Sequence, residues 1–169
     1  MARSDILINY WLRDAHAMEE QAITMLNGQL LRLENYPELS SRIKDHVEET
    51  KRHAELIRGC LERRGAGPST VKDTTGKLMA MAQSLGGIWV NDEVVKGSLA
   101  SYTFEQMEIA SYRILIAATD YVGDLATRKI CEEILKEEEA MAGWLAENFS
   151  PTVKQFLQRD QVASEEAKR

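Results

Sequence analysis

The chain has 169 residues, of which 44% are apolar and 28% charged, and its formal net charge is −6. This length supports one domain with a sizeable core, and the acidic balance argues against a general binder of nucleic acid or anionic membranes, because both require a cationic surface. The sequence has no apolar run long enough to span a membrane and no apolar signal segment near residue 1. Cys60 and Cys131 form no CxxC pattern, so we expect reduced thiols in a cytoplasmic protein.

The first part of the chain carries the 3.6-residue apolar period of amphipathic helices in two segments. We expect a helix over about 4–34 and a second helix over about 37–63. Pro37 separates the two segments, and the glycines in "RRGAGPST" end the second one. The short connection predicts a hairpin of two antiparallel helices.

The second part repeats this arrangement after a crossover of roughly 30 residues. The crossover has little apolar periodicity, and we expect in it a short helix between Thr75 and Leu85. Two further long helices are expected over about 97–122 and 125–148, with the chain turning at Gly123.

Ser150–Pro151 predicts a break after the fourth helix, followed by a short C-terminal helix near 153–158. Residues 159–169 form a charged tail that we expect to be disordered. No segment alternates with period two. The predicted fold is therefore an all-α four-helix bundle, residues 1–158, built from two helix hairpins joined by a long crossover.

Acidic and histidine side chains interrupt the apolar stripes of all four predicted helices. On or beside these stripes lie Glu19 in the first helix, His46, Glu49 and His53 in the second, Glu105 and Glu108 in the third, and Glu138 in the fourth. Glu19 and Glu49 are 30 residues apart, as are Glu108 and Glu138, so each hairpin presents one carboxylate per helix at a similar level. Histidines on one helix and carboxylates on the others thus converge on the predicted core.

Four carboxylates cannot share a dry core as bare anions, because desolvation and mutual repulsion are prohibitive. A single inward Glu or His is more simply a solvated or hydrogen-bonded residue. The coincidence across four helices favours a metal centre instead, because two divalent ions would supply the missing positive charge. Carboxylate and imidazole ligands suit iron, and they also suit manganese and zinc.

Four stretches carry a resemblance to a known family: "LRDAHAMEEQAI", "HVEETKRHAELI", "FEQMEIASYRILIAATDYVG" and "ILKEEEAMAGWL". In combination they resemble the bacterial YciE/YciF-type ferritin-like family, a stress-associated group. The resemblance implies a ferritin-like di-iron bundle and a homodimer. The ligands that it implies are Glu19, Glu49, His53, Glu108 and Glu138. From their positions on the apolar stripes, Glu105, His46 and Tyr112 are further candidates for ligands or close neighbours.

The chain departs from the broad ferritin-like pattern at two positions. Thr50 occupies a position where that pattern has Glu, and Ala142 lies one turn after Glu138, where a second ligand of the fourth helix is expected. These departures fit an asymmetric site, a weakly loaded site or a single ion.

Three functions stay open. The first is a non-haem iron protein with one or two ions per chain; as an enzyme it would be an iron-dependent oxidoreductase acting on oxygen or peroxide. The second is a non-catalytic structural or interaction bundle with a vestigial or passive metal site. The third is a metal-free bundle whose carboxylates pair with waters and arginines such as Arg42 or Arg113.

Overall fold

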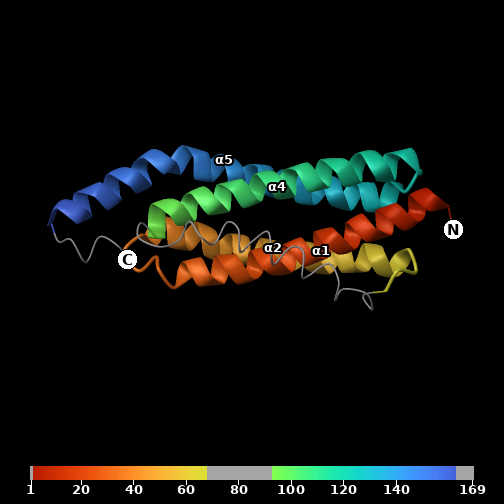
Figure 1. The fold of residues 1–169 in the computed structure, drawn as a ribbon, viewed down its shortest axis with the longest axis horizontal. Coiled ribbons are helices and arrows are strands. Elements are labelled where there is room, and N and C mark those ends of the chain that lie inside the picture. The colour runs from red at the N-terminus through yellow and green to blue at the C-terminus, as the bar shows by residue number, and fades with distance from the viewer. Residues whose placement is uncertain (1, 68–92, 163–169) are drawn as a thin grey trace.

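The computed structural model describes residues 2–67 and 93–162 of the chain. Within these ranges all regular secondary structure is helical, so the predicted all-α four-helix bundle is confirmed (Figure 1). The helices are α1 (Arg3–Leu30), α2 (Pro37–Arg63), α4 (Glu93–Tyr121) and α5 (Leu125–Val162). The crossover helix expected between Thr75 and Leu85, and most of the predicted tail, lie outside the described residues.

The four helices form two hairpins that pack against each other. α1 packs against α2 and α4 packs against α5, while contacts between α1 and α4 and between α2 and α5 join the hairpins. In Figure 1 the α4–α5 hairpin lies above the α1–α2 hairpin, and α5 extends beyond the ends of the other helices. Each helix therefore contributes one stripe to a common core.

A glycine follows each of α2 and α4 and ends the helix. Gly65 follows α2 with φ of 65°, and Gly123 follows α4 with φ of 74°. After each glycine, the next backbone N–H donates to a carbonyl five residues earlier, which is the Schellman arrangement that closes a helix. Asp124 then caps α5, because its Oδ1 accepts the backbone N–H of Thr127 at 3.1 Å.

Two helix boundaries differ from the sequence prediction. α1 ends at Leu30 instead of about 34, and the chain then turns through Tyr36, because the residue before Pro37 disfavours helical geometry. α4 begins at Glu93 instead of about 97, and its first turn packs Val94 into the core.

The predicted break at Ser150–Pro151 is wrong, because α5 runs without interruption through Pro151. A separate short helix over 153–158 is therefore absent. Tertiary contacts hold the segment beyond the proline: Phe156 is buried, and the Gln155 amide donates to the Asn35 carbonyl oxygen at 2.8 Å. These contacts with the loop before α2 offset the missing backbone hydrogen bond of the proline.

The core consists of two apolar clusters that lie along the bundle. The large cluster is centred on Leu12, Ala22, Ile57, Tyr112 and Ile134, and the small cluster on Leu26, Ile43, Val47, Met141 and Leu145. In α2 the small cluster ends at Val47 and the large one begins at Ile57. In α5 they are separated between Ile134 and Met141. The polar side chains of α2 and α5 lie near this boundary, whereas Glu19 on α1 and Glu105 and Glu108 on α4 have large-cluster residues on both sides along their helices.

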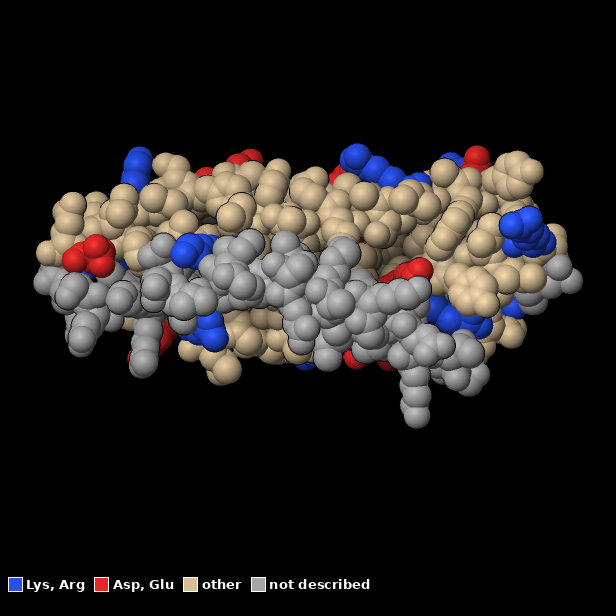
Figure 2. Space-filling view, in the orientation of Figure 1, with Lys and Arg blue, Asp and Glu red and all other residues tan. Residues whose placement is uncertain are grey.

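The surface carries charges of both signs. In the face drawn in Figure 2, Lys and Arg side chains are interspersed with Asp and Glu, and the described residues form no continuous basic patch there. Among the helices that the structure describes, none has the length and apolarity needed to cross a membrane.

Candidate metal centre

Six ionisable side chains meet inside the apolar core, near the boundary of its two clusters, and each is at most 1% exposed. They come from all four helices: Glu19 from α1, His46 and His53 from α2, Glu105 and Glu108 from α4, and Glu138 from α5. Their oxygen and nitrogen atoms form two groups in which one atom per residue lies within 4.8 Å of the others.

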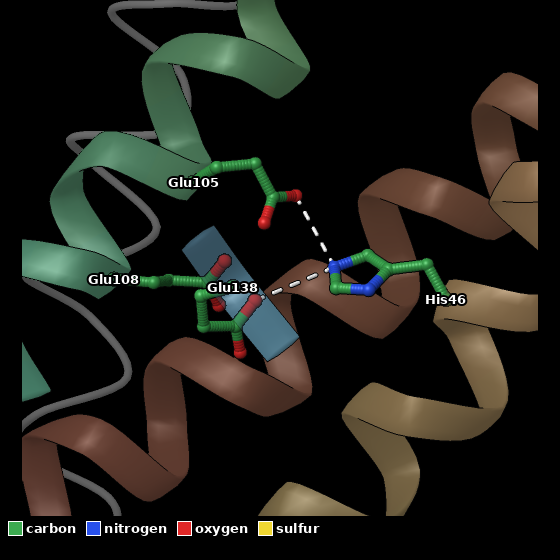
Figure 3. A group of neighbouring side chains, drawn as sticks. All are labelled: His46, Glu105, Glu108 and Glu138. Carbon is green, nitrogen blue, oxygen red and sulfur yellow. Dashed lines mark ion pairs between the residues drawn. The ribbon is translucent and has the colours of Figure 1, made fainter. Parts of the chain in front are cut away.

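The first group contains His46, Glu105, Glu108 and Glu138 (Figure 3). The imidazole of His46 points from α2 toward the carboxylates of α4 and α5. Its Nε2 lies 3.2 Å from Glu105 Oε1 and 3.5 Å from Glu138 Oε2. Three carboxylates and one imidazole therefore converge on one small volume.

The second group contains Glu19, His53 and Glu138. His53 Nδ1 lies 2.8 Å from Glu138 Oε1 and 3.6 Å from Glu19 Oε2. The hydroxyl of Tyr112, which is fully buried on α4, donates a hydrogen bond to Glu19 Oε1. This bond orients Glu19 so that its other oxygen faces His53.

Glu138 belongs to both groups and divides its oxygens between them. Its Oε1 is turned toward His53 and its Oε2 toward His46. A carboxylate in this position can bridge two cations, one in each group.

The hydrogen bonds of these six side chains are incomplete. Eight of their buried polar atoms make no well-aligned hydrogen bond within the described structure, although His53 Nδ1 and Glu138 Oε1 are only 2.8 Å apart: one on Glu19, one on each histidine, one on Glu105 and two each on Glu108 and Glu138. Buried polar atoms are almost always hydrogen-bonded in folded proteins. Unsatisfied oxygens and nitrogens concentrated at one level therefore fit a site built for cations.

The arginines considered in the sequence analysis bind elsewhere. Arg42 donates to Glu49 at 3.1 Å, and Arg113 pairs with the exposed Glu139 at 2.7 Å. Neither contact neutralises the four buried carboxylates. Four carboxylates and two neutral imidazoles match the charge of two divalent ions, and they are ligand types that such ions accept.

Each histidine contacts a further carboxylate with the ring nitrogen that points away from the site. His46 Nδ1 lies 2.8 Å from Glu49 Oε2, and His53 Nε2 lies 2.6 Å from Glu137 Oε2. Glu49, which the family resemblance implies as a ligand, belongs to neither group of buried residues, and its side chain is 28% exposed. Its direct binding to metal stays a prediction.

Without bound metal, protons on these side chains compensate the negative charge of the carboxylates. Burial alone would lower the pKa of His46, but Glu105, Glu49 and Glu138 outweigh it and raise the pKa to about 10. Burial opposes the charge on His53 in the same way, yet Glu138 and Glu19 raise its pKa to about 11. For the carboxyl of Glu108, burial and the neighbouring carboxylates raise the pKa well above its ordinary value. Metal ions would replace these protons.

The remaining predicted residues can now be located. Glu19, His53, Glu108 and Glu138, together with Glu105 and His46, are brought together in the two groups, and Tyr112 contacts Glu19. Ala142 is buried one turn beyond Glu138 and offers no ligand atom. In the group around Glu138, His46 and Glu105 supply ligand atoms instead.

Glu137 was not identified from the sequence. It lies in the run "KEEEA", where nothing distinguishes it from a solvated glutamate, and its contact with His53 joins residues 84 positions apart. Arg52, which precedes His53 on α2, also forms a salt bridge with Glu137. Only the packing of α2 against α5 reveals this role.

Residues 3–158 match the sequence family described as "Domain of unknown function (DUF892)". A protein of known structure from Xanthomonas campestris pv. campestris is 39% identical, with a TM-score of 0.80, and the match covers 94% of this chain and 99% of that chain. Sequence and fold are thus shared over nearly the full length of both chains.

Two more distant structures share the fold. YcfI from Rhodopseudomonas palustris, described as a putative structural protein, is 24% identical with a TM-score of 0.71, covering 86% of this chain and 94% of that chain. The E. coli stress protein YciF is 23% identical with a TM-score of 0.72, covering 92% of this chain and 99% of that chain.

Proposed function

This chain belongs to the DUF892 family, and we propose that it is a ferritin-like metal-binding protein whose bundle holds two divalent ions, most simply iron, between its hairpins. The observation that carries the proposal is the set of eight buried polar atoms without hydrogen bonds on six converging side chains.

The six side chains would divide the work of binding. His46, Glu105 and Glu108 would hold one ion, Glu19 and His53 the other, and Glu138 would contact both. The surrounding apolar core excludes water from this level, which strengthens each electrostatic contact. Iron bound there would supply redox chemistry toward oxygen or peroxide.

Metal content of the purified protein, measured by inductively coupled plasma mass spectrometry, tests this proposal. We expect close to two ions per chain after reconstitution of wild-type protein with ferrous iron under anaerobic conditions. Glu138→Gln, which keeps the side-chain volume and removes the shared ligand, should lose most of the bound metal. Glu133→Gln, an exposed position on the same helix, is the matched control and should bind as the wild type does.

Wild-type protein that binds no more metal than Glu138→Gln would refute the proposal. The same samples also test the choice of metal, since manganese and zinc compete for the same ligand types. A stress-related role and a homodimer remain proposals carried by the family resemblance, and a cytoplasmic location remains a proposal carried by the cysteine pattern. Light scattering combined with size-exclusion chromatography tests the homodimer.

The second candidate function is a structural bundle in which the ions only tie the four helices together. It is favoured by the buried Ala142, which leaves α5 with one ligand instead of two, and by the description of YcfI as a putative structural protein. Iron-dependent consumption of peroxide or oxygen by reconstituted protein distinguishes the two functions. Catalysis that Glu138→Gln abolishes favours the oxidoreductase, and full metal loading without turnover favours the structural role.

A further inference from the structure

The two buried histidines are held from outside the metal site by different ring nitrogens. Glu49 lies on α2 itself, one turn after His46, and reaches Nδ1, the ring nitrogen nearer to the backbone. Glu137 comes from the facing helix α5 and reaches Nε2 of His53, the nitrogen at the far end of the ring. The carboxylate from the same helix thus contacts Nδ1, and the carboxylate from the opposite helix contacts Nε2.

Each of these two carboxylates, Glu49 and Glu137, also accepts a hydrogen bond from an arginine. Arg42 donates to Glu49 Oε2 at 3.1 Å, and Arg52 donates to both oxygens of Glu137. The guanidinium group stays protonated in proteins, so each carboxylate beside it is stabilised as an anion. An anionic carboxylate accepts hydrogen bonds and donates none, so the ring nitrogen that faces it must carry the hydrogen.

The other nitrogen of each ring points into the site. His46 Nε2 faces Glu105 and Glu138, and His53 Nδ1 faces Glu138 and Glu19. Neither of these nitrogens has a hydrogen-bond partner among the described residues. When the ring is neutral, this is the nitrogen with the free lone pair.

We propose that Glu49 and Glu137 are positioning residues that fix opposite tautomers of the two histidines, so that His46 binds metal through Nε2 and His53 through Nδ1. The inference rests on the proposed function and specifies how its site is assembled. Each arginine–carboxylate–imidazole chain orients its ring and increases the basicity of the nitrogen that binds the ion. Glu49 then acts through His46 instead of contacting the metal.

Nuclear magnetic resonance of zinc-loaded protein labelled with ¹⁵N-histidine tests the assignment. Zinc is diamagnetic and accepts the same ligands, so long-range ¹H–¹⁵N correlations can identify which ring nitrogen is metal-bound and which carries hydrogen. We expect His46 and His53 to give opposite patterns. Metal bound to the same nitrogen of both rings would overturn this inference while leaving the proposed metal site intact, whereas protein that binds no zinc would overturn both.

Two variants test the positioning role by calorimetric zinc titration. Glu49→Gln and Glu137→Gln keep the side-chain volume but remove the negative charge. Each should lower the binding affinity of one of the two ions by about 10- to 100-fold. Leucine at these positions also removes the hydrogen-bond acceptor, so the ¹⁵N pattern should change at His46 in Glu49→Leu and at His53 in Glu137→Leu. Glu48→Gln and Glu133→Gln, on the exposed faces of the same helices, are the controls and should leave both ions unaffected.

Two results would contradict the positioning role. One is wild-type zinc affinity in both Glu49→Gln and Glu137→Gln. The other is weaker zinc binding in Glu49→Leu and Glu137→Leu that leaves the ¹⁵N patterns of both histidines unchanged, because a purely structural role would lower affinity without changing which nitrogen carries hydrogen. Circular dichroism on each variant verifies that the helical fold is retained.

Discussion

The bundle contains two polar networks, one half-buried and one fully buried, whose charges are compensated in different ways. At one end, the guanidinium of Arg64, 11% exposed, donates to Asn9 Oδ1 at 2.6 Å, to Asp124 Oδ2 at 2.5 Å and to Asp5 Oδ1 at 3.1 Å. In the middle, four carboxylates and two histidines leave eight polar atoms without hydrogen bonds. The Arg64 network is satisfied by the chain's own groups, whereas the central one depends on something that the chain does not supply.

This contrast indicates which polar residues serve folding and which serve binding. The Arg64 network joins α1, the end of α2 and the cap of α5, so it fixes how the two hairpins meet. The central cluster lies inside the apolar core, where each of its side chains is almost fully buried. Its charges therefore reduce the stability of the metal-free fold, which is expected of a site selected for a ligand.

The largest expected effect is the stabilisation of the wild-type protein by metal. At a free zinc concentration 1,000 times the dissociation constant, each ion should add about 4 kcal/mol to the free energy of unfolding. For a chain of this size, that corresponds to a rise in melting temperature of roughly 8–16 °C, measured by differential scanning calorimetry. Glu138→Gln should abolish this rise while Glu133→Gln preserves it, and a wild-type melting temperature indifferent to zinc would remove the contrast between the networks.

Arg64→Met should produce the converse result. It removes the cation that two aspartates and Asn9 share, and it should lower the free energy of unfolding by about 1–3 kcal/mol in urea titrations. Zinc stoichiometry should stay at the wild-type value, because the network is separate from the central cluster. Loss of bound metal in a variant that remains folded would mean that the two networks are not independent.

Tyr112→Phe should have a smaller effect, confined to the central cluster. The substitution keeps the ring in the large apolar cluster and removes only the hydroxyl that donates to Glu19. We expect the ion beside Glu19 to bind about tenfold more weakly, equivalent to one hydrogen bond to a charged group. Calorimetric titration should resolve one weakened ion and one unchanged ion, and equal weakening of both would contradict the division into two groups.

The smallest effect concerns the pH dependence of the Arg64 network in the metal-free protein. Burial alone would raise the pKa of Asp124, but hydrogen bonds from Thr127 and the guanidinium of Arg64 outweigh it and lower the pKa. A carboxylate whose folded pKa is lowered stabilises the fold above its unfolded value, near 3.8, and that stability is lost as pH falls through the folded pKa. Wild-type protein should therefore lose more stability below about pH 4 than Asp124→Asn does, as measured by urea titration at each pH.

Local sequence signals predicted much of this structure. Pro37 and Gly65 fixed the bounds of α2, because proline begins a helix and glycine adopts the positive φ that ends one. The 3.6-residue period also pointed Glu19, Glu108 and Glu138 inward, where the structure has them. These predictions depend on single helices, in which sequence spacing translates directly into direction.

Features that depend on contacts between helices could not be predicted in this way. The continuation of α5 through Pro151 relies on packing near Asn35, more than 100 residues earlier in the chain. The contact between His53 and Glu137 depends on the register of α2 against α5. Periodicity indicates which face of a helix is buried but not the register of one helix against another. The partners of each histidine could therefore not be predicted from it.

Glu138, with one oxygen directed at each histidine, makes the two halves of the centre coupled equilibria. An ion in one group would fix the orientation of this carboxylate and remove part of the repulsion felt by the other group. The second ion would then bind to a site altered by the first, which is thermodynamic cooperativity. Substitutions of Glu138 and of a residue in either group should accordingly be non-additive, because both would interrupt the same linkage.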